Sequence, residues 1–135
     1  MKKKGFYEYD PVIYPRRLYV VIGYDTKFLK NVFAYDGGRE LEDIDDNSNG
    51  VTYFEVMRKD NKKIGELVVF PSKKEMTMNV ISHESSHVCD GIEEALGISH
   101  GGEHSAYLMG WIASCVNKSR LGIGTYVELK AEENG

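Results

Sequence analysis

The chain has 135 residues, of which 41% are hydrophobic and 28% are charged, and its formal net charge is −4 at pH 7. This ordinary composition predicts one soluble domain over residues 1–135, and the negative charge argues against nucleic acid, whose binding proteins carry a concentrated basic face. No apolar run approaches the roughly 20 residues that span a bilayer or resembles a secretory signal. We therefore expect no membrane association and a cytoplasmic location, in a bacterium or a phage-infected host cell.

The N-terminal half is predicted to form an antiparallel sheet. Residues 16–24 are rich in β-branched and aromatic side chains, which is typical of a strand, and 30–38 indicate a second, shorter strand. Residues 51–71 predict a hairpin, because two apolar runs flank turn-forming residues at 59–62. The acidic, turn-rich stretch 39–50 is expected to be a surface loop.

The C-terminal half is predicted to be mostly helical. Ser72 and Glu75 fit a capping box, and the apolar spacing that follows predicts a helix from near Ser72 to the glycine at 97. Residues 103–119 indicate a second helix, 124–129 a last short strand and 130–135 a frayed tail. Strands followed by two helices predict an α+β fold, with the sheet packed against both helices.

The stretch "ISHESSHVCDG", residues 81–91, contains two histidines four residues apart. On a helix His83 and His87 share one face and can bind one metal ion, while Glu84 points to the side, within reach of a metal-bound water. This HExxH spacing is typical of zinc hydrolases. It predicts Zn²⁺ bound by His83 and His87, with Glu84 as the general base. The alternative for the same pattern is two solvated histidines without a metal.

A catalytic zinc needs a third protein ligand and an open fourth position. Glu103 opens the predicted second helix, 16 residues after His87, and is the first candidate. His100 and His104, which flank the entry to that helix, are the alternatives. Glu93 lies six residues after His87, where another class of zinc site has its third ligand, but the glycine which that pattern requires is missing.

A peptidase of this kind also needs a donor for the developing oxyanion and a surface for the substrate main chain. His104 is predicted as the donor, with His100 and Tyr107 as further side chains of a suitable type. The strand at 63–71, or its hairpin partner, is predicted to bind the substrate as an added strand. Asp90 is expected to orient His87 through its second ring nitrogen.

The segment 80–112 resembles the small HExxH metallopeptidases of bacteriophages and prophages of gut bacteria. In that group the HExxH helix is followed by a helix of the type E-x-x-A-Y-L-x-G. The resemblance implies a minimal zincin-like peptidase of the gluzincin type that cleaves a protein or peptide, and it favours Glu103 as the third ligand. The extra histidines of "SHGGEH" depart from the pattern. The matching positions are His83, Glu84, His87, Glu103, Ala106, Tyr107, Leu108 and Gly110.

Two other functions are compatible with the same residues. One is a metal-binding but non-hydrolytic phage or host accessory protein that binds or blocks a protein partner. The other is a domain in which the histidines are surface residues and no metal is bound. Metal content separates the last case from the other two, and loss of activity in Glu84→Gln with retained zinc separates an enzyme from an accessory protein.

Overall fold

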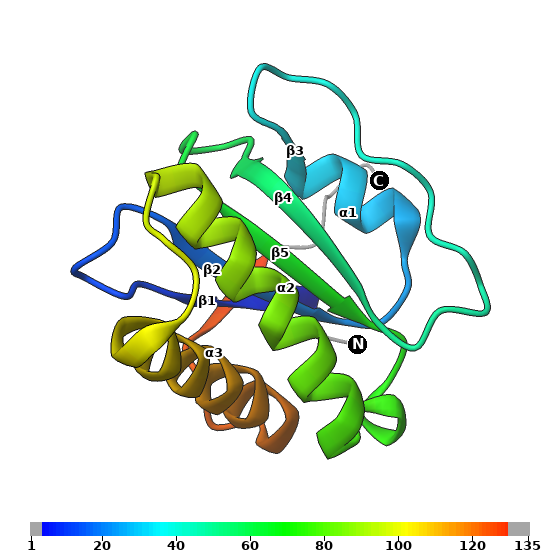
Figure 1. Ribbon diagram of the computed structural model, residues 1–135. Helices are drawn as coiled ribbons and strands as arrows, with labels where there is room; N and C mark the ends of the chain where they lie inside the picture. Colours follow the sequence, from blue (N-terminus) through cyan, green and yellow to red (C-terminus); the bar gives the residue numbers. More distant parts are fainter. Residues whose placement is uncertain (1–3, 130–135) are drawn as a thin grey trace.

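The computed structural model describes residues 4–129, which form a six-stranded mixed sheet and three α-helices (Figure 1). The strands lie in the order β3-β4-β5-β2-β1-β6. They are β1 (Lys4–Tyr9), β2 (Arg17–Ile22), β3 (Phe33–Tyr35), β4 (Val51–Arg58), β5 (Ile64–Phe70) and β6 (Tyr126–Leu129). The helices are α1 (Thr26–Val32), α2 (Met78–Leu96) and α3 (Gly102–Leu121), and a short 3-10 helix, η1 (Lys73–Glu75), precedes α2.

The α+β class is confirmed, but the sheet is mixed rather than antiparallel. The two central strands, β2 and β5, run parallel, and all other strand pairs are antiparallel. Gly65 makes this pairing possible, because a Cβ at this position would lie 1.9 Å from the backbone oxygen of Arg17. The antiparallel prediction was wrong here because turn residues indicate the pairing only of strands that follow one another in the chain. β2 and β5 are joined through a long crossover instead.

The sheet separates two hydrophobic cores, with α2 and α3 on one face and α1 on the other (Figure 1). The central strands are buried on both faces, which explains their mainly apolar sequences. None of the helices in residues 4–129 combines the length and apolar character that crossing a membrane requires. The core under α2 and α3 includes Leu18, Val20, Val68, Phe70, Ile92 and Ile112. The core under α1 includes Tyr19, Leu29, Phe33, Leu67 and Val69.

Local signals placed most of the elements, with three differences. The hairpin, the helix at 103–119 and the last strand are confirmed as β4–β5, α3 and β6. The first strand, β1, was not predicted, and part of the predicted strand 30–38 is the end of α1, which is capped by Asp25. Helix α2 begins at Met78 rather than near Ser72, and it ends at Leu96 with Gly97 as the predicted C-terminal stop. The predicted tail 130–135 lies outside the described residues.

The start of α2 differs because Thr77, not Ser72, is its N-cap. The Thr77 hydroxyl accepts a hydrogen bond from the backbone N–H of Val80 at 3.2 Å. Ser72 makes no side-chain capping bond and precedes η1 instead. Met76, with φ −84° and ψ 62°, lies outside the helical region and separates η1 from α2.

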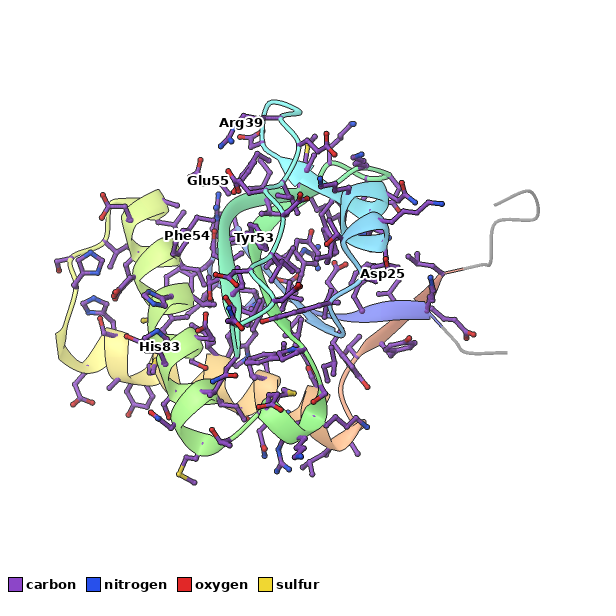
Figure 2. All side chains as sticks on the ribbon, turned by 90° about the vertical axis from the view of Figure 1, so that its right-hand side faces the viewer. Asp25, Arg39, Tyr53, Phe54, Glu55 and His83 are labelled. Atoms are coloured by element: carbon purple, nitrogen blue, oxygen red, sulfur yellow. The ribbon has the colours of Figure 1, made fainter. Side chains whose placement is uncertain are left out.

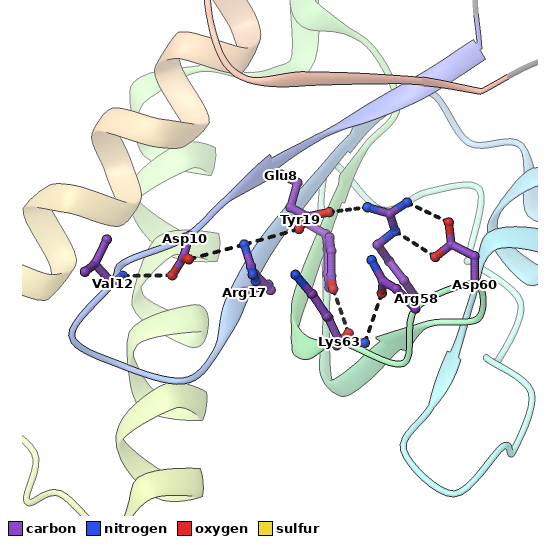
Figure 3. Close-up of polar contacts among 9 residues, drawn as sticks. Glu8, Asp10, Val12, Arg17, Tyr19, Arg58, Asp60 and Lys63 are labelled. Carbon is purple, nitrogen blue, oxygen red and sulfur yellow. Dashed lines mark hydrogen bonds and ion pairs between the residues drawn. The ribbon is translucent and has the colours of Figure 1, made fainter.

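Charged side chains tie β1 and β2 to the β4–β5 turn (Figure 3). The guanidinium of Arg58 donates to Glu8 and to Asp60, each at 2.7 Å. Arg17 lies 3.5 Å from Glu8 and 3.3 Å from Asp10. Glu8 therefore links two arginines from different strands, and the network holds this end of the sheet together.

A second ion pair is buried beneath a β-bulge in β4. Glu66 in β5 is fully buried, and it accepts hydrogen bonds from Arg16 Nη2 at 2.7 Å and from the backbone N–H of Glu55 at 3.3 Å. The bulge lies between Tyr53 and Val56, and Glu55 has a positive φ of 54° there. The carboxylate thus supports an irregular backbone next to α2.

Arg16→Ala should lower the free energy of unfolding by about 3 kcal/mol, because it leaves the Glu66 carboxylate buried without a cation. Urea unfolding followed by circular dichroism measures this loss. Lys4→Ala is the control, since Lys4 and Asp25 form an exposed pair with 64% and 50% of their side chains accessible. That variant should lose less than about 1 kcal/mol. Equal losses in the two variants would contradict a special role for the buried pair.

Candidate metal centre

His83 and His87 converge on the exposed face of α2, as their spacing predicts. Their Nε2 atoms are 3.2 Å apart, and the two rings stand at 81° to each other. Two nitrogens bound to one tetrahedral zinc ion at about 2.0–2.1 Å lie roughly 3.4 Å from each other. The distance in the structure is that of a hydrogen bond between the two rings, and it is also close to the spacing of ligands that share one ion.

Glu84 turns from the histidines toward the sheet and is held there by β4. It is only 6% exposed, and its Oε1 accepts a hydrogen bond from Thr52 Oγ1 at 2.7 Å. Its Oε2 lies 3.9 Å from His83 Nε2. Gly50 allows this close approach, because a Cβ there would lie 2.9 Å from Glu84 Cγ. One carboxylate oxygen is thus fixed by the strand, and the other lies beside the histidine pair.

The strand that can accept an added peptide is β4, not β5. The stretch 63–71 was one candidate, but β5 lies between β4 and β2 and has no free edge. Its hairpin partner β4 pairs with β3 only at Val56–Arg58. Within the described part of the chain, no strand pairs with the outer edge of Val51–Phe54. This free segment includes Thr52, the residue that binds Glu84.

The structure does not bring Glu103 together with the two histidines. Glu103 is exposed in the first turn of α3. Helix α3 packs on the side of α2 that carries Cys89, whose Sγ lies 3.8 Å from the backbone oxygen of Ser105. At 3.6 residues per turn, His87 points roughly 160° away from Cys89. In residues 4–129 neither His83 nor Glu103 belongs to a group of three metal-binding side chains within 4.8 Å. Glu103 as a zinc ligand stays a prediction.

The alternative ligands His100 and His104 lie beside Glu93 instead. Glu93 is 1% exposed, and its carboxylate lies 3.0 Å from His100 Nδ1 and 3.4 Å from His104 Nε2. Ser105 donates a further hydrogen bond to Glu93. Asp90, expected to orient His87, lies 3.7 Å from His100 Nδ1. Asp90, Glu93 and His100 have donor atoms within 4.8 Å of one another, but their mutual contacts already join α2 to the loop before α3.

The predicted oxyanion donor, His104, also has a local partner. Its Nε2 lies 2.6 Å from the backbone oxygen of Ser99. Tyr107, the other side chain considered for this role, is 77% exposed on α3. The catalytic role of His104 stays a prediction, and in this structure the ring contributes to the α2–α3 connection.

Comparison with protein-family models, with curated proteins and with solved structures finds no match to this chain. The function is therefore inferred from the residues themselves. Among the described residues, His83, Glu84 and His87 have the HExxH spacing that is typical of zinc hydrolases.

Electrostatics stabilise the contact between Glu93 and His100. Burial acts to raise the pKa of Glu93, but hydrogen bonds with Ser105 and His100 outweigh it, so the pKa lies below the ordinary 4.5. The hydrogen bond to Glu93 raises the pKa of His100 above its ordinary 6.5. The contribution of Glu93 to stability is lost as pH falls below about 4.5, and that of His100 as pH rises above about 6.5. The pairing should therefore be strongest between these two values.

Glu93→Gln should return the pKa of His100 toward 6.5, because the substitution removes the negative charge while keeping the size of the side chain. A pH titration of the His100 ring signals by two-dimensional NMR measures the change. Glu75→Gln is the control, since it removes a carboxylate from η1, before the opposite end of α2. An unchanged titration of His100 in Glu93→Gln would show that the pair does not form in solution.

Proposed function

We propose that this chain is a zinc-dependent peptidase in which His83 and His87 bind the ion and Glu84 is the general base. The main support is the 3.2 Å separation of the two Nε2 atoms, with the Glu84 carboxylate beside them. Further support comes from the free segment of β4 next to Glu84. In this proposal α2, α3 and the sheet form a minimal zincin-like arrangement.

Each residue of this group has a defined chemical task. Zinc, when bound, supplies a Lewis acid that lowers the pKa of a bound water toward about 7. Glu84 accepts a proton from the attacking water and later passes it to the leaving amine. The hydrogen bond from Thr52 to Oε1 leaves Oε2 as the oxygen that exchanges the proton. Thr52 thus orients the base without contacting the reacting atoms.

The two histidines fit a zinc ion, but the position of Glu103 does not complete the ligand set. We propose Glu103 as the third ligand after a movement of the first turn of α3 toward His87. Gly101, the N-cap, and Gly102, the first residue of α3, have φ values of 92° and 81° and give the backbone of this turn the necessary freedom. His100 and His104 are less suited, because Glu93 already binds His100 and the backbone oxygen of Ser99 already binds His104.

The substrate in this proposal is a protein or an extended peptide. Such a chain can pair with the free edge of Val51–Phe54 by main-chain hydrogen bonds, as peptides do when they add a strand to a sheet. The pairing brings a peptide bond past Thr52 and therefore past Glu84. This supports hydrolysis of peptide bonds over other reactions of zinc-bound water.

The experiment that tests the proposal combines a metal assay with a digest. Protein purified without added zinc is analysed for metal content and then incubated with a diverse peptide library, whose products are identified by mass spectrometry. We expect one zinc per chain and cleavage at defined sites. Zinc without any cleavage would favour the non-hydrolytic accessory protein, and absence of zinc would favour a domain with surface histidines.

A further inference from the structure

Phe54 is a large aromatic side chain that belongs to neither hydrophobic core. It is 41% exposed, more than any of the side chains that make up the two cores. Burial of phenylalanine is one of the larger gains available to a folding chain, so its position at the surface of β4 calls for another explanation. Figure 2 shows Phe54 between β4 and α2, on the same side of the molecule as His83.

The ring of Phe54 lies directly on the backbone of α2. A Cβ at Gly91 would lie 2.4 Å from its Cδ1 atom and 2.6 Å from its Cε1 atom, so only glycine admits the ring at this place. Gly91 follows His87 by four residues and therefore continues the face of α2 that carries both histidines. The aromatic surface is thus about one helical turn, 5.4 Å, beyond the candidate zinc ligands.

The bulge in β4 fixes the direction of this side chain. Phe54 and Glu55 are both exposed, between buried Tyr53 and Val56, because the register shifts at this point. The backbone of Glu55 is held on two sides, by Glu66 at 3.3 Å and by the N–H of Asp36 at 2.8 Å. Bulges often re-aim side chains next to binding sites. Phe54 is therefore a pre-positioned apolar surface rather than a mobile one.

We infer that Phe54 forms one wall of a substrate subsite that selects a large aliphatic or aromatic residue about two positions from the cleaved bond. The inference rests on the proposed peptidase function. A peptide paired with Val51–Phe54 passes Glu84 at Thr52, and two strand residues later, about 6.8 Å on, it reaches Phe54. A side chain at that position contacts the exposed part of the Phe54 ring, where a charged group gains nothing. Phe54 thus determines specificity while Glu84 performs the chemistry.

The test uses capped octapeptides randomised at their four central positions and digested by the zinc-loaded full chain. We expect large apolar residues to be enriched at one position, about two residues from the cut. Phe54→Ser should reduce this preference about tenfold, with little change in cleavage of peptides that have glycine there. Gly91→Ala should disturb the same position, because its methyl group displaces the ring. Phe54→Leu, which stays apolar, should retain most of the preference.

Tyr126→Ser is the matched control. Tyr126 is an aromatic residue with 40% exposure on β6, at the opposite edge of the sheet from β4, so its removal should leave the cleavage profile unchanged. A profile that is the same in wild type, Phe54→Ser and Gly91→Ala would overturn the inference. An equal change in Tyr126→Ser would also overturn it, because the effect would then be a general loss of structure.

A binding measurement separates failure of the subsite from failure of the proposed function. Glu84→Gln protein, with and without Phe54→Ser, is applied to the same peptides on an array, where no cleavage is required. If wild type cleaves nothing, the peptidase proposal fails, and the array still tests the subsite. Loss of the apolar preference on the array in the double variant supports the subsite. An unchanged preference, or no positional preference in Glu84→Gln alone, overturns it.

Discussion

Glu84→Gln is expected to lower peptide hydrolysis by about 10²–10⁴-fold, the usual loss when a general base is removed. Zinc content and fold should stay unchanged, because glutamine has the same size and its amide oxygen can still accept the hydrogen bond from Thr52. What the variant cannot do is take a proton from the attacking water. The expected result is therefore a metal-loaded, folded and nearly inactive protein.

The measurement is kcat/KM on a single peptide taken from the library digest, together with zinc content by mass spectrometry. Glu75→Gln provides the control, since this residue in η1 makes no contact with the histidine pair in the proposed mechanism. A rate close to that of wild type in Glu84→Gln would assign the base to another residue. Activity lost together with zinc would instead show that Glu84 is needed to hold the metal.

The part of this site that the sequence could predict is the part set by helix geometry. His83 and His87 meet because residues four apart share a face of any helix, and no tertiary contact is needed for that conclusion. The position of Glu84 beside them follows from the same period. The hairpin β4–β5 could be predicted equally well, since its turn residues and its two apolar runs are neighbours in the chain.

The remaining features depend on contacts between distant segments. Thr52 binds Glu84 across 32 residues, and no local pattern indicates that β4 rather than β5 lies beside the carboxylate. The parallel pairing of β2 and β5 has no turn signal either. The burial of Glu93 against His100 depends on how the loop after Gly97 folds back. A capping box at Ser72 was a sound local signal, but the non-helical backbone at Met76 moved the start of α2 to Met78.

Phe54 shows how a feature can be present in the sequence without being recognised. An aromatic residue at this place in a strand is ordinary, and a glycine within a helix usually indicates close packing. Only the structure places Phe54 on Gly91 and shows that both lie beyond the histidine pair. The bulge that exposes the ring is stabilised by Glu66 and Arg16, which the sequence gives no reason to connect.

His87→Ala is expected to remove stoichiometric zinc and activity together. Changes in groups that merely orient a metal ligand typically cost 10–100-fold in affinity, so loss of a ligand should weaken zinc binding by at least about 100-fold. Zinc affinity is measured by competition with a chelator of known affinity, and the activity by the same peptide as for Glu84→Gln. The two variants then distinguish a ligand from a base, since only His87→Ala loses the ion.

Two further variants identify the third ligand and test the place of the ion. Glu103→Gln should weaken zinc binding by a similar factor if the first turn of α3 moves to the histidines, because an amide is a poorer zinc ligand than a carboxylate. His100→Ala should leave the affinity unchanged, since this ring is bound by Glu93. Unchanged zinc affinity in Glu103→Gln together with weakened affinity in His100→Ala would contradict the proposal. If His100→Ala releases the ion and His87→Ala retains it, zinc lies among Asp90, Glu93 and His100, and Glu84 is not a zinc-assisted base.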